Sequence, residues 1–184
     1  MKRLLCCLSL LAVTFSAAAQ APKAPPASPP ATALGSIGGK PISIAYSSPG
    51  VKGREGKVFT ADGLIKTARG SQYPIWRAGA NAATTIVLGG DVKIGSLPVP
   101  AGTYTLFVNI SDPDNWTLIV NKATGEWGLA YDPSKDLGKT PMTMSTPSSM
   151  VENLKWEITD KGNGTGTISL SWENHTATVS VHAH

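Results

Sequence analysis

The stretch PAGTYTLFVNI at residues 100–110 decides the fold class that we predict for this chain. Its Pro-Ala-Gly start favours a tight reversal, because proline presets φ and glycine accepts positive φ. Beyond this turn, large apolar residues alternate with a more polar set. The apolar positions are Tyr104, Leu106, Val108 and Ile110, and the positions between them are Thr105, Phe107 and Asn109. A period of two is typical of a β-strand with one buried face, so the stretch predicts a turn followed by a strand.

The same alternation recurs along the chain, whereas the period of an amphipathic helix does not. It predicts further strands at residues 42–46, 84–88, 92–97, 116–120, 127–131, 154–158, 168–172 and 177–181. Turns rich in glycine, asparagine and aspartate separate many of them. Residues 137–149, which contain two prolines, are expected to form an edge strand and a loop. We therefore predict an all-β chain, a single antiparallel β-sandwich or flattened barrel of about nine strands.

The N-terminal segment has the order of a secretory signal peptide. Lys2 and Arg3 precede an apolar run, and the run ends before small residues at 17–19, so cleavage is expected after Ala19. A membrane anchor is the alternative, but the run is shorter than the roughly 20 residues that span a bilayer. We expect a periplasmic or secreted bacterial protein with no membrane span after cleavage.

Residues 20–36, QAPKAPPASPPATALGS, are predicted to be a Pro/Ala-rich spacer, because they carry five prolines and few side chains that can pack. The folded domain is then expected over residues 37–184. After cleavage, 14 basic and 12 acidic residues remain, and this near balance gives no case for nucleic-acid binding. Cleavage also removes Cys6 and Cys7, so the mature chain has no disulfide, thiol nucleophile or thiolate metal ligand.

Four separated motifs carry a resemblance to a known family. They are YSSPGVKGRE at 46–55, WRAGANAATTI at 76–86, PAGTYTLFV at 100–108, and WTLIVNK followed by WG at 116–128. In this order they resemble a family of secreted bacterial proteins known only as a domain of unknown function, over most of residues 42–181. The resemblance implies a secreted all-β domain without an established activity. It also implies an acidic residue after the asparagine that is Asn81 here, where this chain has Ala82.

The stretch from Trp76 to Ile86 sets Arg77 and Asn81 among very small side chains. Asn81 is expected in a left-handed bulge, since asparagine accepts that conformation better than most residues. In one interpretation other parts of the protein occupy the space beside these small side chains, and Arg77 forms a salt bridge with a carboxylate such as Asp91 or Glu126. In the other interpretation the guanidinium of Arg77 binds a ligand anion or carboxylate.

Other candidate ligand-binding residues lie outside this stretch. Arg54 belongs to a basic loop with two glycines, and a concave pocket that held Arg54, Arg77 and Asn121 with a titratable partner would favour ligand capture or activity. Among the tryptophans, Trp76, Trp116 and Trp127 are candidates for lining a groove. Two others, Trp156 and Trp172, alternate in phase with aliphatic residues and are expected in the core.

Neither the histidines nor a search for known catalytic motifs supports a metal site or a catalytic site. His182 and His184 share a strand face near the C-terminus, but no third metal ligand stands at a useful spacing. A catalytic triad would need His175 beside Glu173, or a tail histidine, as its base, and no G-x-S-x-G or H-E-x-x-H is present. We predict no catalytic residue, no metal site and no cofactor.

Two functions remain open from the sequence. The favoured one is a non-catalytic binding module for a small polar or anionic ligand or for an envelope protein. The alternative is a hydrolase whose active site is assembled from separate loops and leaves no linear motif. Convergence of the candidate residues in one pocket would favour ligand capture or activity, and their dispersal would favour a structural module.

Overall fold

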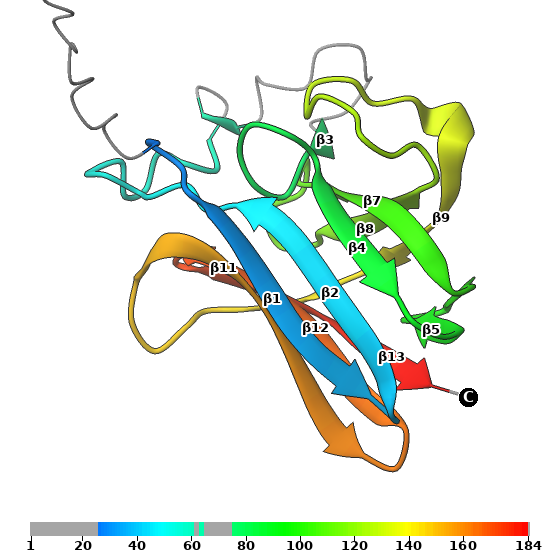
Figure 1. Cartoon of the computed structure of the whole chain (residues 1–184). Coiled ribbons are helices and arrows are strands. Elements are labelled where there is room, and N and C mark those ends of the chain that lie inside the picture. The colour runs from blue at the N-terminus through cyan, green and yellow to red at the C-terminus, as the bar shows by residue number, and fades with distance from the viewer. Residues whose placement is uncertain (1–25, 61–62, 65–74, 184) are drawn as a thin grey trace, which may run out of the picture.

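The chain folds into two antiparallel sheets that pack face to face, as the computed structural model of residues 26–60, 63–64 and 75–183 shows (Figure 1). The fold is all-β, as predicted, and the sheets form a sandwich. The described residues form thirteen strands, where the periodicity predicted about nine. The predicted signal peptide and residues 20–25 lie outside the described residues.

The first sheet has the order β1-β2-β4-β7-β8-β9, and β3 pairs with one end of β7. Every pairing in it is antiparallel. Its strands are β1 (Pro30–Ile37), β2 (Lys40–Ser47), β3 (Ile75–Trp76), β4 (Thr84–Leu88), β7 (Gly102–Asn109), β8 (Thr117–Asn121) and β9 (Asp136–Pro141). β9 is an edge strand, which confirms the prediction for the start of 137–149.

The second sheet has the order β11-β12-β13-β5-β6, and β10 pairs with β13. Its strands are β5 (Val92–Ile94), β6 (Leu97–Val99), β10 (Thr143–Ser145), β11 (Val151–Gly162), β12 (Thr165–Glu173) and β13 (His175–Ala183). Figure 1 shows β1 and β2 crossing in front of β11, β12 and β13. The two sheets approach closely where β1 meets β11. At this point a Cβ atom added to Gly35 would stand only 2.8 Å from Cγ2 of Ile158.

The core between the sheets contains the alternating side chains that the sequence predicted. Leu106 and Val108 of β7 are fully buried there, and Trp156 and Trp172 face them from the second sheet with 3% exposure each. The other face of β7 is buried as well. Phe107 and Ile119 pack with Tyr131 of the 122–135 segment, which lies over the outer face of this end of the first sheet.

Three sequence predictions need correction. The prediction of a spacer is wrong for residues 30–36, because these residues belong to β1, which pairs with β2 along its whole length. Their small side chains do not prevent this, since strand pairing is made by backbone hydrogen bonds. Residues 127–131 form no strand, since they belong to the loop that covers Phe107 and make only an isolated bridge from Trp127 to Ala82. The single strand predicted at 92–97 is a hairpin, because the chain turns at Gly95 with φ of 57°.

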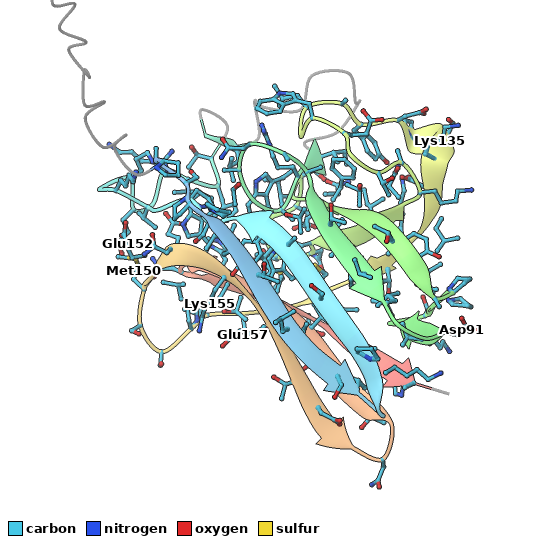
Figure 2. The ribbon with its side chains drawn as sticks, in the orientation of Figure 1. Asp91, Lys135, Met150, Glu152, Lys155 and Glu157 are labelled. Atoms are coloured by element: carbon cyan, nitrogen blue, oxygen red, sulfur yellow. The ribbon has the colours of Figure 1, made fainter. Side chains whose placement is uncertain are left out.

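The described residues contain no helix that is long and apolar enough to cross a membrane. A short 3-10 turn, η2 (Pro133–Lys135), precedes β9. Figure 2 shows Lys135 beside this turn and Asp91 at another corner of the molecule, between β4 and β5.

Candidate functional site

The loop between β3 and β4 is held rigidly by hydrogen bonds from the core. Trp156 donates its indole N–H to the carbonyl of Ala78 at 3.0 Å, and the hydroxyl of Thr84 donates to the same oxygen. Trp76 donates its own indole N–H to the carbonyl of Gly79 at 3.0 Å. These contacts satisfy buried polar groups with backbone acceptors, so the loop is anchored to both sheets.

Two non-glycine residues in this loop have left-handed backbone conformations. They are Ala78, with φ of 54°, and Asn81, with φ of 61°. The prediction of a left-handed Asn81 is therefore confirmed. Its side-chain amide donates longer hydrogen bonds to the carbonyl of Ser28 at 3.4 Å and the hydroxyl of Ser47 at 3.3 Å. Non-glycine residues with positive φ persist where the surrounding contacts determine the conformation.

Arg77 is half-buried and has no carboxylate partner among the described residues. Its guanidinium donates to the carbonyl of Asn81 at 2.6 Å, and Gly128 packs against its Cδ and Nε. Burial lowers the pKa of Arg77 from its ordinary value because part of its hydration is removed, although a guanidinium stays protonated at neutral pH. The interpretation that paired it with Asp91 or Glu126 is wrong, and Asp91 instead accepts from the backbone N–H of Ala101.

Arg54 lies on the loop that follows β2 and stabilises that loop. It donates from Nε to the carbonyl of Val51 at 3.0 Å and from Nη2 to the carbonyl of Gly50 at 2.8 Å. These two bonds use only part of its five N–H donors. Its guanidinium is therefore held in place while donors remain available.

Arg54, Trp76, Arg77 and Asn81 line one cleft with a volume of about 330 Å³. The structure thus brings together four of the six residues that the sequence singled out. The described residues that line it are Ser28, Pro49, Arg54, Leu64, Trp76, Arg77, Gly79, Ala80, Asn81 and Trp172. Trp76 and Trp172 stack with ring centroids 5.9 Å apart and lie at the wall of the cleft, where both are almost fully buried. The described lining residues include two cations and no carboxylate, which suits an anion with an apolar body.

The other two candidates lie outside this cleft. Asn121 is buried and donates to the carbonyl of Asp132 at 2.9 Å and to Oδ1 of Asp136 at 2.8 Å, so its role is to fix the loop before β9. Trp127 is 60% exposed on the neighbouring loop. Arg54 and Arg77 therefore share a cleft, whereas Asn121 does not line it.

Tyr131, in the 122–135 segment, binds the same carboxylate of Asp136 as Asn121 does. Tyr131 donates to Oδ2 of Asp136 at 2.7 Å, and Lys139 lies 3.3 Å from the same oxygen. Burial first, and the neighbouring carboxylate of Asp136 second, raise the pKa of Tyr131 well above its ordinary value.

A second polar arrangement lies at the β12–β13 turn, where sequence reasoning named the residues only as a weak triad candidate. Glu173 is buried, and its carboxylate lies 3.4 Å from Nδ1 of His175. Aromatic rings of Phe59 and Trp116 pack around the imidazole. The sequence spacing of Glu173 and His175, two residues apart, does not show that the side chains meet, because their contact depends on the geometry of the β12–β13 turn.

No group of three or more histidine, cysteine, aspartate and glutamate side chains that could hold a metal ion occurs in the part of the chain that the structure describes. His182 is half-buried on β13, and the other tail histidine, His184, lies outside the described residues. The pairing of these two histidines stays a prediction.

Comparison with known proteins identifies a family whose function is not known. Residues 28–181 match the family described as "Protein of unknown function (DUF2911)". This match covers both sheets and the Arg77 cleft. No curated protein and no solved structure matches the chain.

Proposed function

Because the chain belongs to the DUF2911 family of proteins of unknown function, whose description assigns no activity, we propose a function from the cleft itself. The protein is a non-catalytic module that binds a small anionic ligand, with a carboxylate as the group that it recognises. One observation carries this proposal: the half-buried guanidinium of Arg77 lines the cleft and has no carboxylate partner among the described residues.

The chemistry of the cleft supports a carboxylate on an apolar body. Among the described residues the guanidinium of Arg77 has one hydrogen bond, to Asn81, which leaves most of its planar fork of donors to bind two oxygens at once. Arg54 adds a second positive charge in the same cleft. Apolar residues, among them Leu64 and the buried Trp76 and Trp172, line the cleft beside the cations, which favours a ligand whose remainder is apolar.

The lining favours binding over hydrolysis. Its described residues include no histidine, cysteine, aspartate or glutamate, so a general base is absent from this set. A volume of about 330 Å³ lies at the lower end of small-molecule sites, which limits the ligand to a small metabolite or the end of a longer chain.

The test is thermal unfolding of the exported protein with acetate, benzoate, succinate and inorganic phosphate. A ligand at ten times its Kd should stabilise the fold by about 1.4 kcal/mol, or about 4 °C in Tm. We expect benzoate to exceed acetate, because only benzoate has an apolar ring that can contact the apolar lining of the cleft as well as the guanidinium.

Charge-matched variants make this test specific. Arg77→Ala should abolish the ligand-linked rise, whereas Lys93→Ala on β5 should keep it, because Lys93 lies outside the cleft. The proposal is contradicted if no anion of the series raises Tm, or if Arg77→Ala responds like the parent. Mass spectrometry of small molecules that co-purify with the native protein would identify the ligand.

We further propose that the protein is exported and acts outside the cytoplasm. The support is the N-terminal order of two cations, an apolar run and three alanines. The intact mass of the exported protein should correspond to a chain beginning at Gln20. A mass that includes Cys6 and Cys7 would contradict the cleavage.

A further inference from the structure

The turn between β12 and β13 places a carboxylate where the backbone favours glycine. Trp172 pairs with His175, so Glu173 and Asn174 form a two-residue hairpin turn, and Glu173 has φ of 55°. Glycine is preferred at such positions. The carboxylate is also buried, with 3% of the side chain exposed, and Oε1 accepts from the backbone N–H of Gly56 at 2.6 Å. A strained backbone and a buried charge together point to a task for this side chain.

Glu173 faces the imidazole of His175, and two aromatic rings pack against this imidazole. The ring of Trp116 stacks parallel to it at 5.6 Å with an interplanar angle of 8°, and Phe59 approaches at 4.6 Å. Nδ1 is buried 3.4 Å from Oε2 of Glu173, without a hydrogen bond in the described structure. The imidazole is 29% exposed, so the edge that carries Nε2 is the part left to face solvent.

His175 lines a second cleft, distinct from the Arg77 cleft. The second cleft has a volume of about 260 Å³, and its lining includes His175, Met144 and Asp114. The carboxylate of Asp114 has no hydrogen bond or ion pair among the described residues. The cleft therefore combines an imidazole nitrogen, a thioether and a negative charge.

Strand register places Met144 and His175 on the same face of the second sheet. Met144 of β10 pairs with Ala177 of β13, and Ala177 lies two residues from His175 on that strand. Such diagonal neighbours have Cβ atoms less than about 8 Å apart, within reach of long and aromatic side chains. Both side chains line the same cleft, so Nε2 and the thioether sulfur can bind one ion between them.

We propose that this cleft is a Cu(I) site, with Nε2 of His175 and Sδ of Met144 as protein ligands. A thioether is a soft ligand that favours Cu(I), and imidazole binds copper well. Glu173 is the positioning residue: its carboxylate, 3.4 Å from Nδ1, favours the tautomer with the proton on Nδ1 and so leaves the lone pair of Nε2 for the metal. The negative charge of Asp114 favours a cation in the same space.

The experiment titrates the exported full-length chain with Cu(I), kept reduced by ascorbate without oxygen, against a chromogenic Cu(I) chelator. The parent should bind one equivalent. Met144→Leu keeps the shape of the side chain but removes the sulfur, and should weaken Cu(I) binding by about tenfold or more. Glu173→Gln should weaken it by about 10–100-fold, as is usual for a group that orients a metal-bound histidine.

Met150→Leu is the matched control. Met150 is 40% exposed in the segment before β11 and is not part of this cleft (Figure 2), so its replacement should leave the affinity unchanged. X-ray absorption of the copper-loaded parent should show a sulfur ligand that Met144→Leu lacks. Because both methionine variants replace one methionine by leucine, circular dichroism should show both folded.

The Cu(I) site is overturned if the parent fails to compete with the chelator, or if Met144→Leu binds as tightly as Met150→Leu. Preference for Zn(II) over Cu(I) would also overturn it, because a thioether does not select zinc. These outcomes leave the anion cleft untouched, since that cleft is tested with different ligands and different residues.

Discussion

Gly128 lies directly on the side chain of Arg77. A Cβ placed on Gly128 would stand 2.9 Å from Nε of Arg77 and closer still to Cδ. The outer loop therefore closes one side of the guanidinium, and the 330 Å³ cleft remains its open side. A glycine at this position lets the loop approach while Arg77 keeps its hydrogen bond to Asn81.

Gly128→Ala should test this contact. The added methyl group must displace Arg77 or the loop, so we expect a loss of roughly 1–3 kcal/mol in the free energy of unfolding and weaker anion binding. Urea unfolding and the anion-linked Tm rise measure the two effects. Gly125→Ala is the control from the same loop: with φ of 74° and open space around it, it should cost about 1 kcal/mol without changing binding.

Arg77→Ala should change the stability of the ligand-free protein by less than about 1 kcal/mol. The guanidinium has one hydrogen bond, to a carbonyl of an exposed residue that water can satisfy, and no carboxylate is left unpaired by its removal among the described residues. Urea unfolding without ligand measures the change. A loss of 2 kcal/mol or more would show that Arg77 has a carboxylate partner.

Asn81 supplies the comparison for that variant. Because its φ is 61°, Asn81→Ala should lose about 1 kcal/mol, whereas Asn81→Gly should be close to the parent. Equal losses in both would mean that the longer side-chain bonds to Ser28 and Ser47 matter more than the backbone conformation.

Trp156→Ala should destabilise the fold by roughly 3–5 kcal/mol, because the indole is buried and its N–H satisfies the carbonyl of Ala78. Trp127→Ala is the matched change at a 60% exposed site and should cost less than about 0.5 kcal/mol. Chemical denaturation of the two variants separates core from surface, and similar midpoints would contradict the burial described for Trp156.

Alkaline pH should destabilise the protein through Tyr131. Its pKa is raised in the folded state, so above about pH 10, the ordinary tyrosine pKa, the unfolded chain loses this proton while the folded chain keeps it. Stability that is present at lower pH is then lost as the pH rises.

Tyr131→Phe should flatten this alkaline slope, at the cost of the hydrogen bond to Asp136. Tyr104→Phe is the control, because its phenol donates to the carbonyl of Pro100 and not to a carboxylate. Urea midpoints between pH 9 and 11 measure the slopes, the window following from the ordinary tyrosine pKa. If Tyr131→Phe keeps the slope of the parent, then Tyr131 is not the group responsible.

Local patterns determined the fold class and part of the site. The alternation at 104–110 predicted β7, because the faces of a strand repeat every two residues whatever the strand pairs with. The phase of Trp156 and Trp172 predicted their burial for the same reason. The left-handed backbone of Asn81 was also predictable, since that preference belongs to the residue itself.

The tertiary structure alone decided which faces are covered and which distant residues meet. Phe107 lies on the face that alternation leaves open, yet the 122–135 segment buries it. Arg54 and Arg77 share a cleft while Asn121 lies elsewhere, and Met144 shares a cleft with His175 through the pairing of β10 with β13. Periodicity states which side chains share a face of a strand. Long-range strand pairing and loop packing, which depend on the whole chain, determine what stands opposite that face.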